Sequence, residues 1–243
     1  MFKVKVLTIF PELFPGPLGI SVIGRALKKK IWELNAINIR DFAIDKHKSI
    51  DDSPAGGGAG MVFKPDVLGR AIGSVKKGFV NKSVGKIICL SPRGKLLTQK
   101  VAKQLLSYKN IILICGRFEG IDQRAIDHYE VEEISIGDYV LSGGEIAAFA
   151  LIDTCVRLLP GVLGKDASSK EESFGISTEY ERLLEYDQYT KPTKWKGLSV
   201  PSVLLSGNHK EIKKWRLENA QVRTKRQRPD LQNEGHENGK NSN

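Results

Sequence analysis

The chain has 243 residues, of which 40% are hydrophobic, and it carries a formal net charge of +10. That apolar content suffices for a real core and excludes wholesale disorder. The longest apolar runs, such as residues 146–152, are far too short to span a membrane. The N-terminus reads as a strand and lacks the cleavage motif and apolar core of a signal peptide.

The three cysteines, Cys89, Cys115 and Cys155, are widely spaced and lie in apolar surroundings. Their number and context favour buried free thiols over disulfides or a zinc site. We therefore expect a cytoplasmic protein that makes no membrane contact.

The excess positive charge is concentrated near the C-terminus. Residues Lys191 to Arg228 contain eleven Lys or Arg and two acids, a balance of +9. The preceding stretch, Lys165 to Asp187, contains seven acids and three bases, a balance of −4. This asymmetry indicates a polyanion-binding C-terminal module on a near-neutral N-terminal body, with a merely solvated basic face as the alternative.

Hydrophobic periodicity predicts alternating strands and helices over the first 160 residues. Strands are expected at 2–9, 34–42, 86–90, 110–115 and 131–136. Helices are expected at 19–30, 65–75, 98–106 (capped by Thr98), 121–128 and 144–159. The alternation is typical of an α/β fold with a mostly parallel sheet. The helix at 144–159 is apolar almost all round, so its own domain or a second subunit has to cover it.

The segment 45–63 is too rich in glycine and charge to be regular. A loop of this length inside a compact domain is usually functional. Its core, Gly56 to Gly60, would let the backbone approach a ligand closely, or would behave as a flexible linker.

The sequence after Gly161 predicts a different organisation. We expect an α/β domain at 1–160, a polar acidic linker at 161–177, a small, mainly helical basic domain at 178–231 and a disordered tail at 232–243. A basic helix should run from Lys210 to about Arg226, capped by Ser206 or Asn208. Its inner face is predicted to contain Ile212, Trp215 and Val222. His209 has no cysteine or second histidine at ligand spacing, so no metal site is expected there.

Three loops that follow predicted strands carry the candidate chemistry. They are LSPRG (90–94), CGRFEG (115–120) and IGDYVLSGGE (136–145). In a parallel sheet they converge at the carboxyl edge, where they offer backbone amides and carbonyls, polar side chains and an apolar patch. This suits a ligand with an aromatic base and a polar ribose. The loops lack the GxGxxG spacing of dinucleotide sites and the Gly-Lys-Ser/Thr of P-loops.

These loops, together with GGGAGM (56–61), PGVLG (160–164), SF (173–174), LLEYDQYTKP (183–192) and LLSGNHKEIKKWR (204–216), closely resemble the bacterial tRNA (guanine-N1)-methyltransferases that act at tRNA position 37. The resemblance runs from Met1 to about Leu231. It implies S-adenosylmethionine as methyl donor, tRNA as partner and a deep trefoil knot of the SPOUT class over roughly Ile87 to Leu151. It also implies an obligate homodimer whose active site is shared between subunits.

The resemblance further implies which residues bind the ligands. The cofactor would be surrounded by Leu90, Ser91, Pro92, Gly116, Arg117, Glu119, Ile136, Gly137, Asp138, Tyr139, Val140, Leu141, Gly143 and Gly144. The tRNA would be contacted by Gly58, Gly60, Ser206, Asn208, His209, Lys213, Lys214, Arg216 and Arg223. Relatives are reported to need magnesium, but the sequence has no dedicated cage of oxygen ligands, so any Mg²⁺ would be bound through substrate and a carboxylate.

The implied catalytic residues are Arg157, which would act on the guanine, and a carboxylate just before the Ser-Phe pair. The family has an aspartate there, whereas this chain has Glu172. Glutamate keeps the chemistry of a general base for the N1 proton but adds one methylene. Asp166 and Glu171 are the alternative bases.

The chain departs from the family pattern at Ser53, Ala55, Asp187 and Lys191, and these departures bear on tRNA docking rather than on the chemistry. Two other functions stay open on the sequence, namely a knotted RNA ribose 2′-O-methyltransferase and an inactive RNA-binding protein.

Overall fold

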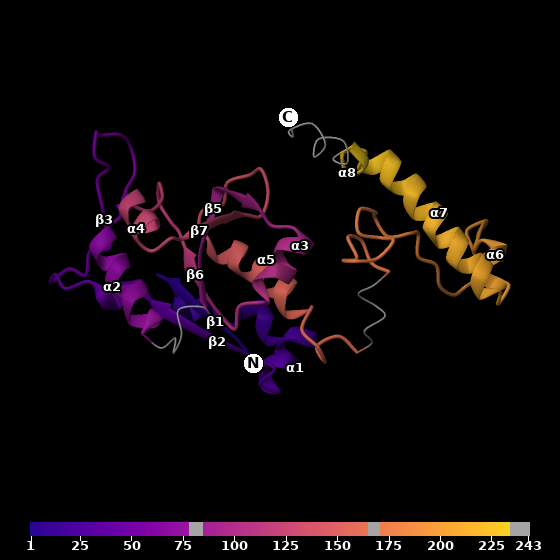
Figure 1. Ribbon diagram of the computed structural model, residues 1–243, viewed down its shortest axis with the longest axis horizontal. Helices are drawn as coiled ribbons and strands as arrows, with labels where there is room; N and C mark the ends of the chain where they lie inside the picture. The colour runs from indigo at the N-terminus through magenta and orange to yellow at the C-terminus, as the bar shows by residue number, and fades with distance from the viewer. Residues whose placement is uncertain (78–84, 165–170, 234–243) are drawn as a thin grey trace, which may run out of the picture. The chain divides into compact units, whose positions relative to one another are not determined.

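The computed structural model describes residues 1–77, 85–164 and 171–233. Its chain divides into two compact units, 1–164 and 165–243 (Figure 1). Of the sequence predictions, the base candidate Asp166 and most of the predicted tail lie outside the described residues. Each unit is built around its own core.

A five-stranded parallel sheet forms the centre of the first unit. Its strands are β1 (Phe2–Thr8), β2 (Trp32–Asn38), β5 (Gly85–Leu96), β6 (Asn110–Cys115) and β7 (Glu132–Ser135), in the order β2-β1-β6-β5-β7. All four pairings in this sheet are parallel. The prediction of an α/β fold with a mostly parallel sheet is therefore confirmed.

Helices cover both faces of this sheet (Figure 1). The helices α1 (Ser21–Lys28), α3 (Gln99–Leu105) and α5 (Glu145–Val156) share one core with one face, and α2 (Pro65–Lys76) and α4 (Gln123–His128) share another with the opposite face. Strand β6 serves both cores, since Ile111 and Leu113 point to the first and Ile112 and Ile114 to the second. A strand buried on both faces reads as a continuous apolar run, as NIILIC does.

The predicted C-terminal ends of two strands, 34–42 and 86–90, were wrong by four residues or more. Strand β2 ends at Asn38, not at residue 42, because the Asn38 side chain accepts a hydrogen bond from the Arg40 amide and caps a 3₁₀ helix, η3 (Ile39–Phe42). Strand β5 does not end at Leu90. It bulges over Ser91–Gly94 and resumes, so that both Leu90 and Lys95 pair with Ile134.

The remaining short elements of the first unit lie in its loops. Two 3₁₀ turns, η1 (Pro11–Leu13) and η2 (Gly16–Gly19), follow β1. The glycine-rich segment, predicted to be irregular, is closed at its base by an antiparallel ladder of β3 (Asp51–Asp52) and β4 (Val62–Phe63). The predicted Thr98 cap of α3 is confirmed, with the hydroxyl accepting from the Val101 amide.

Helix α5 is covered mostly by its own unit. Ala148, Leu151, Ile152 and Cys155 are buried in the core, while Ile146 is 60% exposed. Burial in the core of the first unit thus accounts for most of the apolar residues of α5, without cover by a second subunit.

The second unit contains a hairpin of β8 (Lys194–Trp195) and β9 (Leu198–Ser199), followed by α6 (Ser202–Leu205), α7 (His209–Gln227) and α8 (Asp230–Asn233). Of the two predicted caps for the basic helix, Asn208 fills the position, since its side chain accepts from the Glu211 amide. Ser206 instead accepts from the Asn208 amide.

The inner face of α7 was predicted incorrectly at one position. Val222 is 69% exposed, whereas Ala220 and Thr224 are fully buried. Tyr180 and Tyr186 complete this small core, with Trp215 packed against it. Thr224 is a buried polar residue because its hydroxyl donates to the Ala220 carbonyl and accepts from the Leu184 amide.

Candidate functional site

A cavity of about 240 Å³ opens at the carboxyl edge of the sheet, where the bulge of β5 over Ser91–Gly94 meets the loops after β6 and β7. The loops converge at this edge, as the parallel arrangement predicted, and the three strands are also neighbours in the sheet. Every predicted cofactor residue except Asp138 lines the cavity. The remaining lining residues were not predicted, and they include Cys89, Arg93, Phe118, Ile121, Glu133, Ser135, Ser142 and Ala147.

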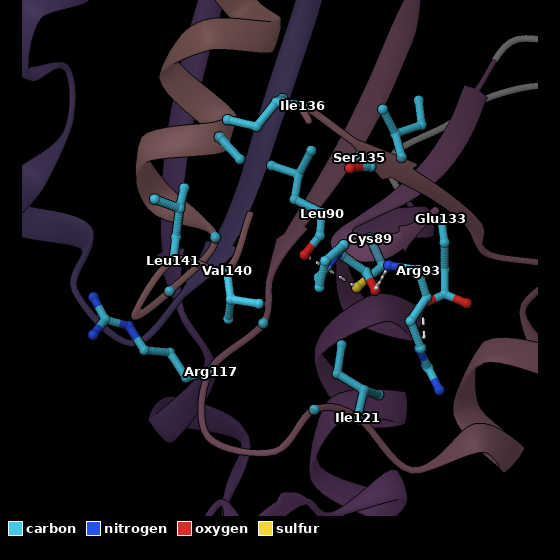
Figure 2. A pocket seen from close by; sticks show the side chains of 18 of the residues that line it. Cys89, Leu90, Arg93, Arg117, Ile121, Glu133, Ser135, Ile136, Val140 and Leu141 are labelled. Atoms are coloured by element: carbon cyan, nitrogen blue, oxygen red, sulfur yellow. Dashed lines mark hydrogen bonds and ion pairs between the residues drawn. The ribbon is translucent and has the colours of Figure 1, made fainter. Parts of the chain in front are cut away.

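Figure 2 shows how apolar and charged side chains are divided within this cavity. Leu90 and Val140 lie in the middle of the view, with Arg117 on one side and the Arg93–Glu133 pair on the other. Arg93 Nη2 donates to Glu133 Oε1 at 3.1 Å, and its backbone amide donates to Ser91 Oγ at 3.2 Å. Arg93 and Glu133 thus neutralise each other on one side of the cavity, and the Leu90 and Val140 side chains between the charged groups offer an apolar surface to a ligand.

The third loop presents an apolar surface at the cavity. Val140 is 82% exposed and Tyr139 54% exposed. The Tyr139 hydroxyl donates to the Ile136 carbonyl at 3.2 Å, and Ser135 Oγ accepts from the Gly137 amide at 3.1 Å, so the loop bonds to itself. Its exposed apolar side chains are therefore held in place without being buried.

The second and third loops are joined directly through their backbones. The Gly144 amide donates to the Gly116 carbonyl at 2.9 Å. A Cβ at Gly144 would lie 2.8 Å from the Cα of Cys115, closer than real Cβ atoms approach a neighbouring backbone. The start of α5 therefore rests directly against the end of β6.

A buried carboxylate strengthens this junction. Glu145, the first residue of α5, is 2% exposed. Its Oε2 accepts hydrogen bonds from Arg117 Nε at 3.2 Å and Nη2 at 3.0 Å, and its Oε1 accepts from Thr8 Oγ1 at 2.8 Å. The Arg117 guanidinium also lies over the Phe10 ring, 4.6 Å from its centroid. Arg117 is therefore held by its own chain on two sides.

Gly143 leaves room for the Arg117–Glu145 ion pair because it has no side chain. A Cβ at Gly143 would lie 2.3 Å from Arg117 Nε and 2.6 Å from Glu145 Oε2. Any side chain at this position would displace the Arg117–Glu145 pair.

The glycine-rich loop returns to the second cavity loop. The Glu119 amide donates to the Met61 carbonyl at 2.9 Å, and the Phe63 amide donates to the Gly120 carbonyl at 3.0 Å. A Cβ at Gly60 would lie 2.4 Å from Glu119 Cγ, and Gly60 has a positive φ of 86°. The loop was expected to bring its backbone close to a ligand, but at Gly60 the close neighbour is the side chain of Glu119. Gly58 is exposed.

The buried thiols are unsuited to act as nucleophiles. Burial raises the pKa of Cys89 and of Cys155 to about 12, and it raises the pKa of Cys115 well above its ordinary value. Because the thiolate is the reactive form, Cys89 contributes shape rather than chemistry to the cavity.

The candidate base Glu172 lies in a segment of the second unit that is hydrogen-bonded to the rest of that unit. Next to Glu172, Ser173 Oγ accepts from the Glu185 amide at 2.8 Å, and the Phe174 amide donates to the Leu183 carbonyl at 3.0 Å. On its other side, Glu171 Oε2 accepts from Arg216 Nη1 at 3.1 Å. Residues 171–175, predicted to belong to a linker, are therefore bonded to the body of this unit.

The acidic segment also neutralises part of the basic helix. Glu179 pairs with Lys213 at 3.0 Å, Glu171 with Arg216 at 3.1 Å and Asp187 with Arg223 at 2.8 Å. Three of the predicted RNA-contacting side chains are thus engaged with carboxylates. Asp187, one of the departures from the family pattern, also bonds Asn219 through its amide and its side chain.

Other predicted RNA contacts stay exposed. Lys214 pairs only loosely with Glu218, at 4.0 Å. Ser206, Asn208 and His209 are exposed at the start of α7. Within the described residues, Lys225 and Arg226 have no ion-pair partner and are exposed near the end of the helix. A cationic surface therefore persists along the outer side of α7.

The second catalytic candidate, Arg157, belongs to the first unit. It follows α5 as its C-cap, is half-buried, and its backbone amide donates to the Asp153 carbonyl at 3.0 Å. Glu172, also half-buried, belongs to the second unit.

Over the described ranges, no group of three or more His, Cys, Asp or Glu side chains is placed to hold a metal ion. Nor does any helix in those ranges have the length and apolar character needed to cross a bilayer.

Sequence reasoning missed Glu145 and Thr8. A charged residue directly before a seven-residue apolar run, in EIAAFALI, was a signal that this carboxylate has partners in the interior. Its partner Thr8 lies 137 residues away in sequence, so periodicity had no means of pairing the two.

The first unit has the arrangement of α/β proteins that bind small ligands outside the carboxyl ends of parallel strands. The chain belongs to the family described as tRNA (Guanine-1)-methyltransferase TrmD, whose model matches residues 2–234.

Curated relatives match over nearly their whole length. A protein of Ehrlichia ruminantium (strain Gardel) is 55% identical over 233 residues, which cover 96% of each chain. One of Anaplasma marginale (strain St. Maries) is 53% identical over 93% of each chain, and one of Wolbachia pipientis wMel is 54% identical over 95% of each. All three are named tRNA (guanine-N(1)-)-methyltransferase.

Proposed function

We propose that this protein transfers a methyl group from S-adenosylmethionine to N1 of guanosine at position 37 of tRNA. The observation that carries the proposal is the cavity at the sheet edge, which is lined by all but one of the residues expected to bind this cofactor. Family membership supports the same reaction.

The residues at the cavity fit the cofactor's chemistry. The exposed apolar side chains of the third loop, Tyr139 and Val140, suit the faces of an adenine ring, and the glycine-containing backbone offers amides and carbonyls to a ribose. The volume of about 240 Å³ lies just below the usual range for small-ligand pockets, roughly 300–1,000 Å³. When bound, S-adenosylmethionine supplies an electrophilic methyl group on a sulfonium that leaves as a neutral thioether.

Guanine N1 carries a proton and is a poor nucleophile until that proton is removed. We assign this step to the Glu172 carboxylate as general base. Negative charge then develops on the neighbouring O6, and the Arg157 guanidinium is the cation assigned to stabilise it. The bonds that hold Ser173 and Phe174 support this assignment, because they keep the base on an ordered segment.

Three further properties form part of the proposal. The chain is threaded as a trefoil knot over roughly residues 87–151, which is consistent with loops 116–120 and 136–144 lying against each other at one sheet edge. Two copies form a dimer in which the cavity of one subunit works with the second unit of the other. The enzyme acts in the cytoplasm, where its tRNA substrate is found.

Magnesium, if required, would be bound through the substrate and a single carboxylate. Glu119 is the exposed carboxylate at the cavity. A site with few protein ligands is what Mg²⁺ commonly uses, because it keeps several of its waters.

The test is methyl transfer to an unmodified tRNA transcript with guanosine at position 37, followed by nucleoside analysis. We expect 1-methylguanosine, and none from a transcript with adenosine there. A ribose-methylated nucleoside would instead identify a 2′-O-methyltransferase. Calorimetry with S-adenosylmethionine alone separates both enzymes from an inactive RNA-binding protein, which would release no heat of binding.

A further inference from the structure

The β8–β9 hairpin carries an exposed apolar pair. Its strands are joined by Lys196 and Gly197, whose φ angles of 48° and 85° are those of a type I′ turn. Trp195 pairs with Leu198 in antiparallel register, so the two side chains share one face. The indole is 59% exposed and the leucine 71% exposed. A large apolar surface left in water on a short, regular turn indicates a contact with a partner.

The surroundings of this pair are strongly cationic. Lys196 Nζ lies 4.9 Å from the centroid of the Trp195 ring, and Lys194 is the neighbour on the other side. From residue 188 to residue 210 the sequence contains four lysines and no aspartate or glutamate. This stretch differs from α7, where carboxylates neutralise several basic residues. Its charge complements a polyanion.

The hairpin is also held in position. The Val200 amide donates to the Thr193 carbonyl at 2.9 Å, next to the paired strands. The Tyr189 ring packs edge-on against Trp215 of α7, with centroids 6.2 Å apart. An aromatic side chain on an anchored turn loses little freedom when a ligand binds, which favours its use as a contact.

We propose that Trp195, between Lys194 and Lys196, is a stacking platform for an unpaired base of the RNA substrate. The inference rests on the proposed function and adds to it a contact outside the basic helix. Base stacking on an aromatic ring strengthens RNA binding whatever the base, and the lysines add the attraction for phosphate. A surface that met a second copy of this chain would need no such concentration of lysine.

The first test uses tryptophan fluorescence. The chain has three tryptophans, and Trp195 is the exposed one, since Trp32 is fully buried and Trp215 packs on the core of the second unit. Adding an unmodified tRNA transcript should quench the emission of the wild-type protein. The quenching should be absent from Trp195→Phe and from mixtures with a blunt RNA duplex, which offers no unpaired base.

The second test measures tRNA affinity over a salt series. Trp195→Ala should weaken binding by tenfold or more, and Trp195→Phe should retain most of it because phenylalanine still stacks. The slope of log K against log salt should be unchanged in Trp195→Ala, whereas Lys196→Gln should make it shallower by about 1. Ile44→Ala removes an exposed apolar side chain of the first unit as a matched control and should bind normally.

Two outcomes would overturn the inference. One is wild-type affinity in Trp195→Ala together with undiminished quenching in Trp195→Phe while methylation proceeds, which leaves the proposed function intact. The other is altered self-association of Trp195→Ala without RNA, with the affinity per assembled protein unchanged, which would assign the surface to contacts between copies. Failure of the wild-type protein to bind tRNA at all would refute the proposed function together with this platform.

Discussion

Arg216 donates a hydrogen bond to Glu171, the residue immediately before the proposed base Glu172. The same guanidinium lies over the Tyr186 ring, 4.8 Å from its centroid, and the Tyr186 hydroxyl reaches the Glu171 carboxylate at 3.4 Å. An arginine that the sequence offered as a phosphate contact is therefore joined to the segment that carries the base. If Arg216 positions the base, its loss should lower kcat. If Arg216 contacts RNA phosphate, its loss should raise KM.

Replacing Arg216 by Gln should lower kcat about tenfold with little change in KM for tRNA, because a base displaced by a fraction of an ångström loses its alignment with the N1 proton. Steady-state kinetics with saturating cofactor measure both constants. Glu171→Gln should reproduce the fall in kcat, although glutamate cannot contact phosphate. Lys210→Gln removes one positive charge from the same helix and should leave kcat unchanged. A raised KM with normal kcat in Arg216→Gln would return this residue to the RNA interface.

Glu145→Gln should destabilise the protein by about 2–4 kcal/mol, because it leaves the Arg117 guanidinium without its buried partner. Urea unfolding measures this loss. The affinity for S-adenosylmethionine should fall as well, since Arg117 and the start of α5 both line the cavity. Lys3→Gln is the matched control, because it breaks an ion pair whose side chains are 48% and 45% exposed and should cost less than about 1 kcal/mol. Equal losses in the two variants would contradict the importance given to the Glu145 junction.

Gly143→Ala should reduce cofactor affinity by an order of magnitude or more. The added Cβ would stand 2.3 Å from Arg117 Nε, so the ion pair has to move into the cavity or break. Calorimetry with S-adenosylmethionine gives the affinity, and circular dichroism checks that the variant is folded. Gly164→Ala adds the same methyl where no atom lies within 4 Å and should bind normally. Wild-type affinity for S-adenosylmethionine in Gly143→Ala would show that the Arg117–Glu145 pair can shift without disturbing the cavity.

Stability should fall with rising pH above about 8.5. The folded protein keeps its three thiols protonated, since burial raises the pKa of Cys89 and Cys155 to about 12 and that of Cys115 well above normal, whereas the unfolded chain releases these protons near pH 8.5. The contribution is complete below the unfolded pKa and is lost as the pH rises toward the folded value, by about 1 kcal/mol per thiol and pH unit. Urea midpoints between pH 7.5 and 10 measure the slope.

Cys155→Ala provides the comparison for this pH dependence. The variant is less stable at neutral pH because the smaller side chain leaves a small void. Its free energy of unfolding should fall less steeply with pH, because one thiol fewer titrates on unfolding. Parallel curves for the two proteins would mean that Cys155 does not titrate on unfolding in this range.

The features that the sequence predicted well are those with local or periodic causes. The doubly buried run NIILIC marked β6 as an interior strand, and the loops after three successive strands had to share an edge once the sheet was parallel. The features it did not predict depend on distant partners. Glu145 is buried only because Thr8 and Arg117 form hydrogen bonds with its carboxylate. Glu171, predicted to lie in a linker, forms an ion pair with Arg216 of α7.

The place of β1 in the sheet matters for synthesis on the ribosome. The first strand to be made lies between β2 and β6, and its second neighbour begins at Asn110, more than a hundred residues later. In a nascent chain the edge of β1 that will pair with β6 therefore stays open until β6 emerges, and that edge has to find the right partner ahead of other chains. The slow step of folding should be the pairing of β6 with β1. Translation speed, and chaperones that shield strand edges, should therefore govern how much enzyme a cell obtains.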